Sequence, residues 1–332
     1  VLDTEAGRLQ RIGPGWRPVW SPDGRFLAFN SESSDQRDFG YSIWDGVDVR
    51  RHGRSSSAPV AMALGNSFLV VEQFGGFDDK GDLVADEVPP QIVIHDPVSG
   101  VTNTLNLAAE RRARELWAHH SGPFAVSPSG DAIALMFQAG RGNRYIHPRI
   151  LRSEVVVVRP DGSPVRRNVG GAPVRFLSTG ELVIEDQSVF PVPLDAVSLD
   201  TGVRRRLFTV PSRFFDLSAG GRLVYVTYEN EARAVWVWDA GSSPRRLTDG
   251  EFPALSADGS QVAFGRRGPD KYKGSRTWEA ALYVARIADG AVRRYELAGG
   301  TFAPPEPSDS EGSWAWAPDG RRIALTLEEP PP

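Results

Sequence analysis

The feature that most constrains the fold is a two-strand unit, WRPVWSPDGRFLAF at residues 16–29, that recurs along the chain. Its turn, Ser21 to Gly24, has residues that favour tight turns, with glycine where a positive φ is needed. The apolar residues on either side predict two short strands. The second strand, Phe26 to Phe29, has no polar face and must be covered on both sides. Small sheets stacked around a common axis meet that requirement.

Further copies of this unit align on the turn glycine. They have Asn66, Gly130, Gly180, Gly221, Gly259 and Gly320 at the position of Gly24. Successive turns are 38 residues apart at the shortest (Gly221 to Gly259) and 64 at the longest (Asn66 to Gly130), close to the period of a four-stranded propeller blade where no loop is inserted. The sequence therefore predicts an all-β, seven-bladed β-propeller. Six blades is the alternative count if the divergent second or fourth copy is not a blade.

A second type of hairpin, such as AVWVWDAGSSPRRLT, follows six of the copies. The missing one lies at the other end of the chain, where VLDTEAGRLQRIG (residues 1–13) predicts the outer two strands of a blade. We expect these strands to pair with the inner strands of residues 312–329, so that the ring closes and no sheet edge stays exposed. Residues 1–332 are expected to form one propeller domain of four-stranded antiparallel blades.

The repeats share a sequence pattern: a strand is followed by SPDG, then LAF, then IWD and RRLT. This pattern resembles the WD-like repeats of TolB and of the propellers in prolyl-oligopeptidase-type and tricorn-type peptidases. The resemblance covers nearly the whole chain. It implies a propeller fold and says little about function. TolB has an α/β domain before a six-bladed propeller, so its partner contacts do not transfer. The peptidases carry a G-x-S-x-G nucleophile elbow, which this sequence lacks.

Composition narrows the function classes. The net charge of −4 disfavours nucleic acid as a partner, and no apolar run approaches the length of a membrane span. With no cysteine there is no disulfide, thiolate metal site or cysteine nucleophile. The chain starts at Val1, not methionine, from which we expect an export or anchor segment upstream and a bacterial protein located outside the cytoplasm, in the periplasm or at the cell surface.

The long insertions fall in the second-to-third strand loops and the connections between blades, which share one face of a propeller. We expect this long-loop face to bind the ligand. The loops at 138–153 and 265–280 are rich in Arg, Tyr and Trp, residues common in interface hot spots and in sites for acidic groups, and Arg266 and Arg267 open the second loop. The candidate ligand-binding residues are Arg144, Tyr145, His147, Arg149, Lys271, Tyr272, Arg276 and Trp278.

Two other segments offer alternatives. The acidic run from Asp78 to Glu87 could bind calcium, but it does not match EF-hand spacing and is expected to be a solvated loop. Residues 107–120 are the one predicted helix, and its last residues, His119 and His120, could bind a metal or act as a base together with His147. No HxH or HxxxH pattern occurs, so we assign no metal, cofactor or catalytic residue.

Two charged residues, Arg175 and Asp216, occupy a position on the inner strands that is apolar or small in the other copies. They belong to adjacent blades. Because a lone buried charge is costly, we expect them to form an ion pair across the seam between blades four and five. The alternative is that one of them points into a wet central channel.

The function that these features favour is a non-catalytic binding or scaffold propeller that recognises a protein, peptide or glycan ligand. Two alternatives remain open. One is the sensor or regulatory domain of a larger membrane protein. The other is an enzyme, a lyase or hydrolase of the kind found on seven-bladed propellers.

Overall fold

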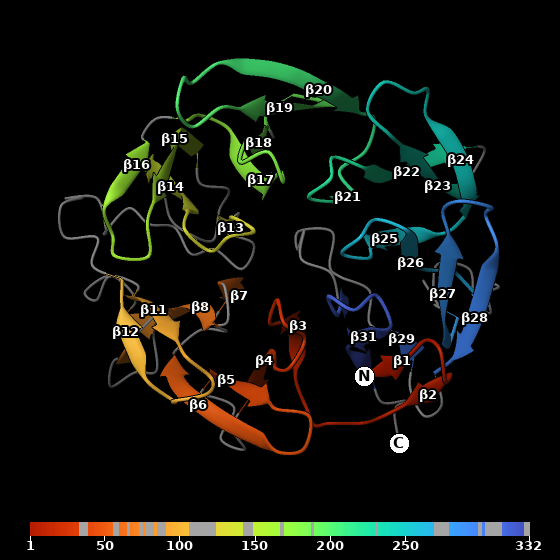
Figure 1. Cartoon of the computed structure of the whole chain (residues 1–332), viewed down its shortest axis with the longest axis horizontal. Helices are drawn as coiled ribbons and strands as arrows, with labels where there is room; N and C mark the ends of the chain where they lie inside the picture. The colour runs from red at the N-terminus through yellow and green to blue at the C-terminus, as the bar shows by residue number, and fades with distance from the viewer. Residues whose placement is uncertain are drawn as a thin grey trace.

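The structure is a computed structural model. It describes residues 1–32, 39–55, 60–64, 67–72, 76–77, 83–84, 91–105, 124–141, 149–166, 169–186, 189–229, 232–268, 279–297, 301–302 and 314–328. In these ranges all regular secondary structure is β-strand. The strands form seven four-stranded antiparallel sheets arranged as blades around a central axis (Figure 1). Seven is therefore the correct blade count, and the propeller expected from the repeats is confirmed.

The first three blades follow chain order from the axis outward. Blade 1 consists of β3 (Trp16–Trp20), β4 (Leu27–Glu32), β5 (Phe39–Trp44) and β6 (Val49–Ser55). Blade 2 consists of β7 (Val60–Leu64), β8 (Ser67–Glu72), β11 (Gln91–His95) and β12 (Thr102–Thr104). Blade 3 consists of β13 (Phe124–Val126), β14 (Ile133–Arg141), β15 (Arg149–Val158) and β16 (Pro164–Arg166).

The next three blades have the same order. Blade 4 consists of β17 (Ala172–Phe176), β18 (Leu182–Glu185), β19 (Val192–Val197) and β20 (Arg204–Val210). Blade 5 consists of β21 (Phe215–Leu217), β22 (Leu223–Glu229), β23 (Ala232–Trp238) and β24 (Arg245–Asp249). Blade 6 consists of β25 (Glu251–Leu255), β26 (Gln261–Gly265), β27 (Ala281–Arg286) and β28 (Val292–Glu296).

Blade 7 closes the ring with strands from both ends of the chain. Its inner strands are β30 (Trp314–Trp316) and β31 (Arg322–Leu325), and its outer strands are β1 (Leu2–Asp3) and β2 (Arg8–Leu9). Leu2 pairs with Ile323 and Asp3 with Arg322, so the expected closure is confirmed. The N-terminus lies at this blade in Figure 1.

Two pairs of short strands lie outside the blades. One pairs β9 (Gly76–Phe77) with β10 (Leu83–Val84), within the insertion of blade 2. The other pairs β29 (Thr301–Phe302) with β32 (Leu327–Glu328). Segments that we expected to be irregular loops thus contain some regular pairing. The hairpin of β14 and β15 is also longer than expected, since its register continues to the pair Arg141 and Arg149.

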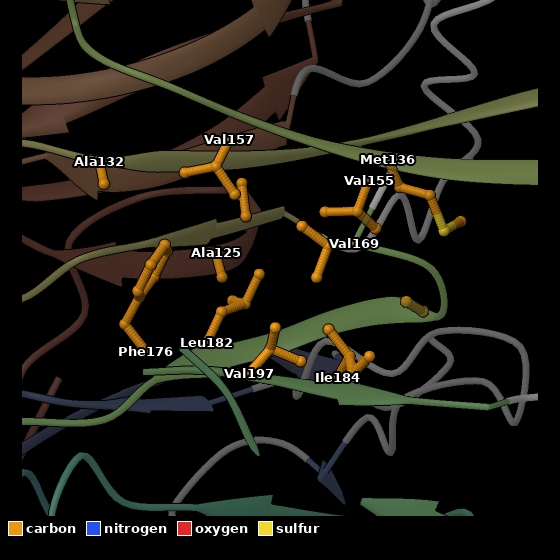
Figure 2. Close-up of a cluster of buried hydrophobic side chains, with 12 residues drawn as sticks. Ala125, Ala132, Met136, Val155, Val157, Val169, Phe176, Leu182, Ile184 and Val197 are labelled. Atoms are coloured by element: carbon orange, nitrogen blue, oxygen red, sulfur yellow. The ribbon is translucent and has the colours of Figure 1, made fainter. Parts of the chain in front are cut away.

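Apolar side chains fill the seams between blades. Between blades 3 and 4, Val155 and Val157 of β15 lie opposite Phe176, Leu182 and Val197 (Figure 2). Each of these side chains is at most 2 % exposed. This is the outcome that strands without a polar face require, because both sides of each sheet are covered by the neighbouring sheets.

The inner strands are also tied together by polar contacts near the axis. Trp20 Nε1 donates a hydrogen bond to the carbonyl of Ala315 at 3.1 Å, and Trp316 Nε1 donates to the carbonyl of Ala254 at 3.0 Å. Each tryptophan thereby pairs its one polar atom with the main chain of the adjacent blade; Trp20 is buried and Trp316 is half-buried.

The expected ion pair lies in the same inner ring. Arg175 and Asp216 are 3.5 Å apart across the seam of blades 4 and 5. Their strand partners, Val183 and Val224, show that the two occupy equivalent positions in their blades. The pairing predicted from the repeat alignment is confirmed.

Candidate functional site

Most of the predicted ligand-binding residues lie outside the described residues: Arg144, Tyr145, His147, Lys271, Tyr272, Arg276 and Trp278. Arg149 is the exception, because its main chain lies in β15, paired with Arg141. The predicted helix at 107–120 and the acidic residues of the calcium alternative also lie outside. The described part of the long-loop face includes its base at blades 5 and 6.

At this base two arginines pair with one buried glutamate, and a third arginine is the chain neighbour of one of them. We call Arg233, Arg266, Arg267 and Glu251 the arginine cluster. The Glu251 side chain is only 4 % exposed and forms ion pairs with Arg233 and with Arg267, whose Nε lies 2.7 Å from Oε1. A buried carboxylate must be paired, and two guanidinium groups meet that need here.

The local sequence GEFP places Glu251 in this position. Gly250 packs so closely on Phe264 that a Cβ at this glycine would overlap the ring. Immediately after it, the register of β25 and β26 shifts between Glu251 and Ala254, and Phe252 has a φ of 52°. This bulge re-aims the side chains at the start of β25, as bulges commonly do beside functional sites.

Aromatic rings position the guanidinium groups of the cluster. Arg266 lies over the ring of Tyr283 at 4.3 Å and donates to Thr248 Oγ1 at 3.0 Å. Arg233 lies over the ring of Tyr228 at 4.7 Å. Stacking and hydrogen bonding limit the rotamers of both side chains, so little conformational entropy remains to be lost when a ligand binds.

Tyr283 links the cluster to a second acidic group. Its hydroxyl donates to Glu279 and accepts a hydrogen bond from Arg294 Nε at 3.1 Å. Burial raises the pKa of Tyr283 above its usual value, and the Glu279 carboxylate raises it further, whereas Arg294 acts in the opposite direction. The phenol is therefore neutral at physiological pH and holds its ring under Arg266.

Of the cluster, Arg266 and Arg267 belong to a loop that the sequence marks as basic, whereas Arg233 and Glu251 do not stand out. The signal for Glu251 is its place in the repeat: it aligns with Trp16, one residue after a glycine that makes the same close approach. A single charged residue at a strand start carries no such signal without the repeat alignment.

The opposite face, which carries the first-to-second and third-to-fourth strand turns, is hollowed over blade 6. This turn-face groove has a volume of about 580 Å³ and runs from Arg222 and Asp239 of blade 5 to Glu5 and Arg321 of blade 7. Between these ends lie Val284, Ile287 and the turn that joins β25 to β26 in blade 6, which contributes Asp258, Ser260 and Gln261. The groove is formed by turns of three blades together, so no single stretch of sequence predicts it.

No metal centre stands out in the ranges that the structure describes: they contain no group of three or more His, Asp or Glu side chains that could hold an ion. His119, His120 and His147 lie outside those ranges, so the metal and base alternatives for them stay untested. In the same part of the chain no helix is long and apolar enough to cross a membrane.

Comparison with known proteins supports the fold alone. No family model matches the sequence, and no curated protein matches it. Among solved structures, an oligogalacturonate lyase in complex with manganese has a TM-score of 0.61 at 13% identity, with 94% of this chain and 86% of that chain covered. A putative TolB from Agrobacterium tumefaciens has a TM-score of 0.51 at 15% identity, with 99% and 96% covered.

TolB from Acinetobacter baumannii has a TM-score of 0.50 at 16% identity, with 82% of this chain covered. The present chain spans 63% of that protein's length. The propeller is thus of the kind seen in TolB structures, as the repeats indicate. At these identities the similarity does not extend to function.

Proposed function

We propose that the chain is a binding propeller that holds a carboxylate-bearing protein, peptide or glycan ligand on its long-loop face at blades 5 and 6. The arginine cluster is the observation that carries this proposal. Arg233 and Arg267 pair with the buried carboxylate of Glu251, and Arg266 adds a third guanidinium group next to Arg267 in the chain, so the four side chains carry three positive charges and one negative charge. Arginine binds carboxylates through two parallel hydrogen bonds, and the positions of these side chains are already set by Tyr228 and Tyr283.

The predicted residues Lys271, Tyr272, Arg276 and Trp278 lie four to eleven residues after Arg267 in the chain and are likewise basic or aromatic. We propose that they complete the site. Arg144, Tyr145, His147 and Arg149 would supply a second basic segment from blade 3.

The test is binding of acidic and neutral probes to the immobilised protein by biolayer interferometry. The acidic probes are oligogalacturonate and a poly-glutamate peptide, and the neutral probe is dextran. We expect binding of at least one acidic probe, weakened about tenfold or more in an R266Q/R267Q double variant and weakened by salt. The matched control, R25Q/R159Q, removes two arginines from the turn face and should leave binding unchanged. Equal loss in both double variants, or equal binding of dextran, would refute the proposal.

A lyase is the second candidate, because solved oligogalacturonate lyases have the same fold over 94% of this chain. Elimination from a uronate needs a base, and His119, His120 and His147 are the candidates. Incubation with oligogalacturonate, with and without Mn²⁺, would reveal a lyase by the ultraviolet absorbance of the unsaturated product. Product formation that is lost in an H119Q/H120Q/H147Q variant would establish catalysis; binding without product supports the non-catalytic propeller.

We further propose that the protein works outside the cytoplasm. The support is the resemblance of its repeats to those of TolB. The test is a fusion of alkaline phosphatase to the protein encoded by the complete gene, because this enzyme is active only after export. We expect an active fusion, and an inactive fusion would overturn this location.

A further inference from the structure

The long-loop face carries large apolar side chains that are exposed to solvent. Phe190 is 60% exposed and Tyr228 is 58% exposed, and Val189 beside Phe190 is exposed as well. Val189 and Phe190 lie in the loop between β18 and β19 of blade 4, and Tyr228 lies near the end of β22 in blade 5. We call these three residues the apolar trio.

The other exposed large apolar residues lie on the opposite face. In the described part of the chain they are all valines in or beside third-to-fourth strand turns: Val47, Val49, Val98, Val101, Val203 and Val292. Valines scattered in this way, one or two to a blade, are ordinary on a protein surface. The apolar trio differs because it contains aromatic rings, and aromatic residues are enriched in protein interfaces and in their hot spots.

The apolar trio leads into the arginine cluster. Tyr228 contacts the cluster directly, because Arg233 lies over its ring at 4.7 Å and pairs in turn with Glu251. Phe190, Tyr228 and Arg267 belong to second-to-third strand loops of blades 4, 5 and 6, or to the strand ends beside them (Figure 1). Equivalent loops of consecutive blades follow one another around the ring, so apolar side chains come first on this arc and basic ones follow.

This order of side chains selects a class of ligand. A carboxylate suits the guanidinium groups of Arg266 and Arg267 at the basic end of the arc. At the other end, Val189, Phe190 and Pro191 have side chains without any hydrogen-bonding group. A sugar placed there would take its hydroxyl groups out of water without a side-chain partner, which costs free energy, whereas an apolar side chain would gain by leaving water. The chemistry favours a polypeptide over a glycan.

We propose that the ligand of the long-loop face is a segment of a protein that carries apolar side chains next to acidic ones. The apolar side chains lie against the apolar trio, and the carboxylates pair with Arg266 and Arg267. This inference rests on the proposed function, since it names the ligand of the same site. Tyr228 joins the two halves, because Arg233 covers one face of its ring and more than half of the residue stays exposed to the ligand.

The test measures binding of three matched peptide sets to the whole chain by microscale thermophoresis. The mixed set joins two apolar residues, leucine and phenylalanine, to two glutamates through glycine-serine spacers of different lengths, in both orders. The acidic set has serine in place of the apolar residues, and the apolar set has glutamine in place of the glutamates. We expect at least one mixed peptide to bind about tenfold more tightly than both of its counterparts.

Variants separate the apolar half of the site from the basic half. V189S/F190S should weaken the mixed peptide about tenfold or more and leave poly-glutamate binding unchanged, whereas R266Q/R267Q should weaken both ligands. If poly-glutamate binds but no mixed peptide binds more tightly than its acidic counterpart, this inference is wrong and the proposed function is still supported. Binding of oligogalacturonate without binding of any peptide would identify a glycan site and overturn this inference. If no acidic probe binds, the proposed function fails together with it.

A control and a conservative variant keep the test specific. V98S/V203S removes two exposed valines from the turn face and should leave binding of the mixed peptide unchanged. Tyr228→Phe keeps the ring under Arg233 and should also bind normally, whereas Tyr228→Ser should weaken the mixed peptide about tenfold. Thermal unfolding of both double serine variants should match the wild type, since the replaced side chains are exposed. Equal loss of binding in the two double serine variants would overturn the proposal.

Discussion

The guanidinium group of Arg175 lies 3.5 Å from the carboxylate of Asp216, across the seam between blades 4 and 5. Asp216 also accepts hydrogen bonds from the main-chain N–H groups of Leu217 and of Leu255 in blade 6, both at 2.8 Å. One aspartate therefore connects three consecutive blades near the axis. Arg175 is 47% exposed, which limits what the ion pair itself contributes.

Removal of each partner should have unequal effects. We expect Arg175→Ala to lower the free energy of unfolding by about 0.5–1 kcal/mol, since the pair is solvent-accessible. Asp216→Ala should lower it by about 2–3 kcal/mol, because two main-chain donors lose their acceptor as well. Urea unfolding of the two variants and of the double variant measures this. Equal losses would mean that the main-chain hydrogen bonds of Asp216 contribute little.

Glu251 offers a sharper test of buried charge. Glu251→Gln keeps the shape of the side chain but leaves Arg233 and Arg267 without their shared anion, and we expect a loss of about 2 kcal/mol in the free energy of unfolding. Glu181→Gln is the matched control: Glu181 pairs with Arg205 at 2.6 Å, but that arginine is 53% exposed. The control should lose no more than about 0.5 kcal/mol. A control that loses as much as E251Q would contradict this account.

The seam of blades 1 and 2 holds a histidine that should respond to pH. His95 is 1% exposed, shares a hydrogen bond of 3.1 Å with the Tyr41 hydroxyl, and lies 4.4 Å from the ring of His52. Burial and, to a smaller extent, the nearby His52 lower the pKa of His95 from 6.5 to about 4, and Asp96 partly offsets these two effects.

Because the folded state binds this proton less readily than the unfolded state, its stability is complete above the unfolded pKa and is lost as the pH falls from 6.5 toward about 4. The expected loss is on the order of 2–3 kcal/mol. Urea unfolding across this range should show a shallower pH dependence for His95→Phe than for the wild type. Identical slopes would show that His95 does not titrate in this way.

Gly250 tests the packing that positions the arginine cluster. A Cβ at this residue would overlap the buried ring of Phe264, so Gly250→Ala should lower the free energy of unfolding by about 2–3 kcal/mol and displace the start of β25. Gly46→Ala is the control: Gly46 has a φ of 98° but open space around its Cα, so only the backbone penalty of about 1 kcal/mol applies. Thermal unfolding of both variants compares the two losses of stability. If G250A is no less stable than G46A, the close approach is not what limits this position.

Much of the local structure follows from the repeats alone. The serine of the SPDG turn illustrates why: Ser21 Oγ donates to Asp23 at 2.6 Å and accepts from the N–H of Phe26 at 3.0 Å, and Ser256 makes the same contacts in blade 6. These bonds join residues at most five apart. Such turns form the same way wherever their residues recur, so the hairpins, the blade count and the ring closure were predictable.

The positions of Arg175 and Asp216 were predictable for a related reason. In a ring of equivalent blades, residues at matching repeat positions on neighbouring blades come close together, so an alignment of repeats gives their proximity. What it did not give is the third partner, the N–H of Leu255, because the direction of a side chain depends on the bulges and twist of its own strand.

The repeat unit, the seven blades, their order and the strand exchange that closes the ring therefore follow from the sequence, because turn chemistry and the period of apolar residues act over a few residues. The positions of the charged clusters depend instead on how the blades pack. The arginine cluster depends on a bulge that buries Glu251 beside Arg233 of the preceding blade, and the turn-face groove depends on turns of three blades. Contacts between distant segments are set by packing between blades, which no local pattern encodes.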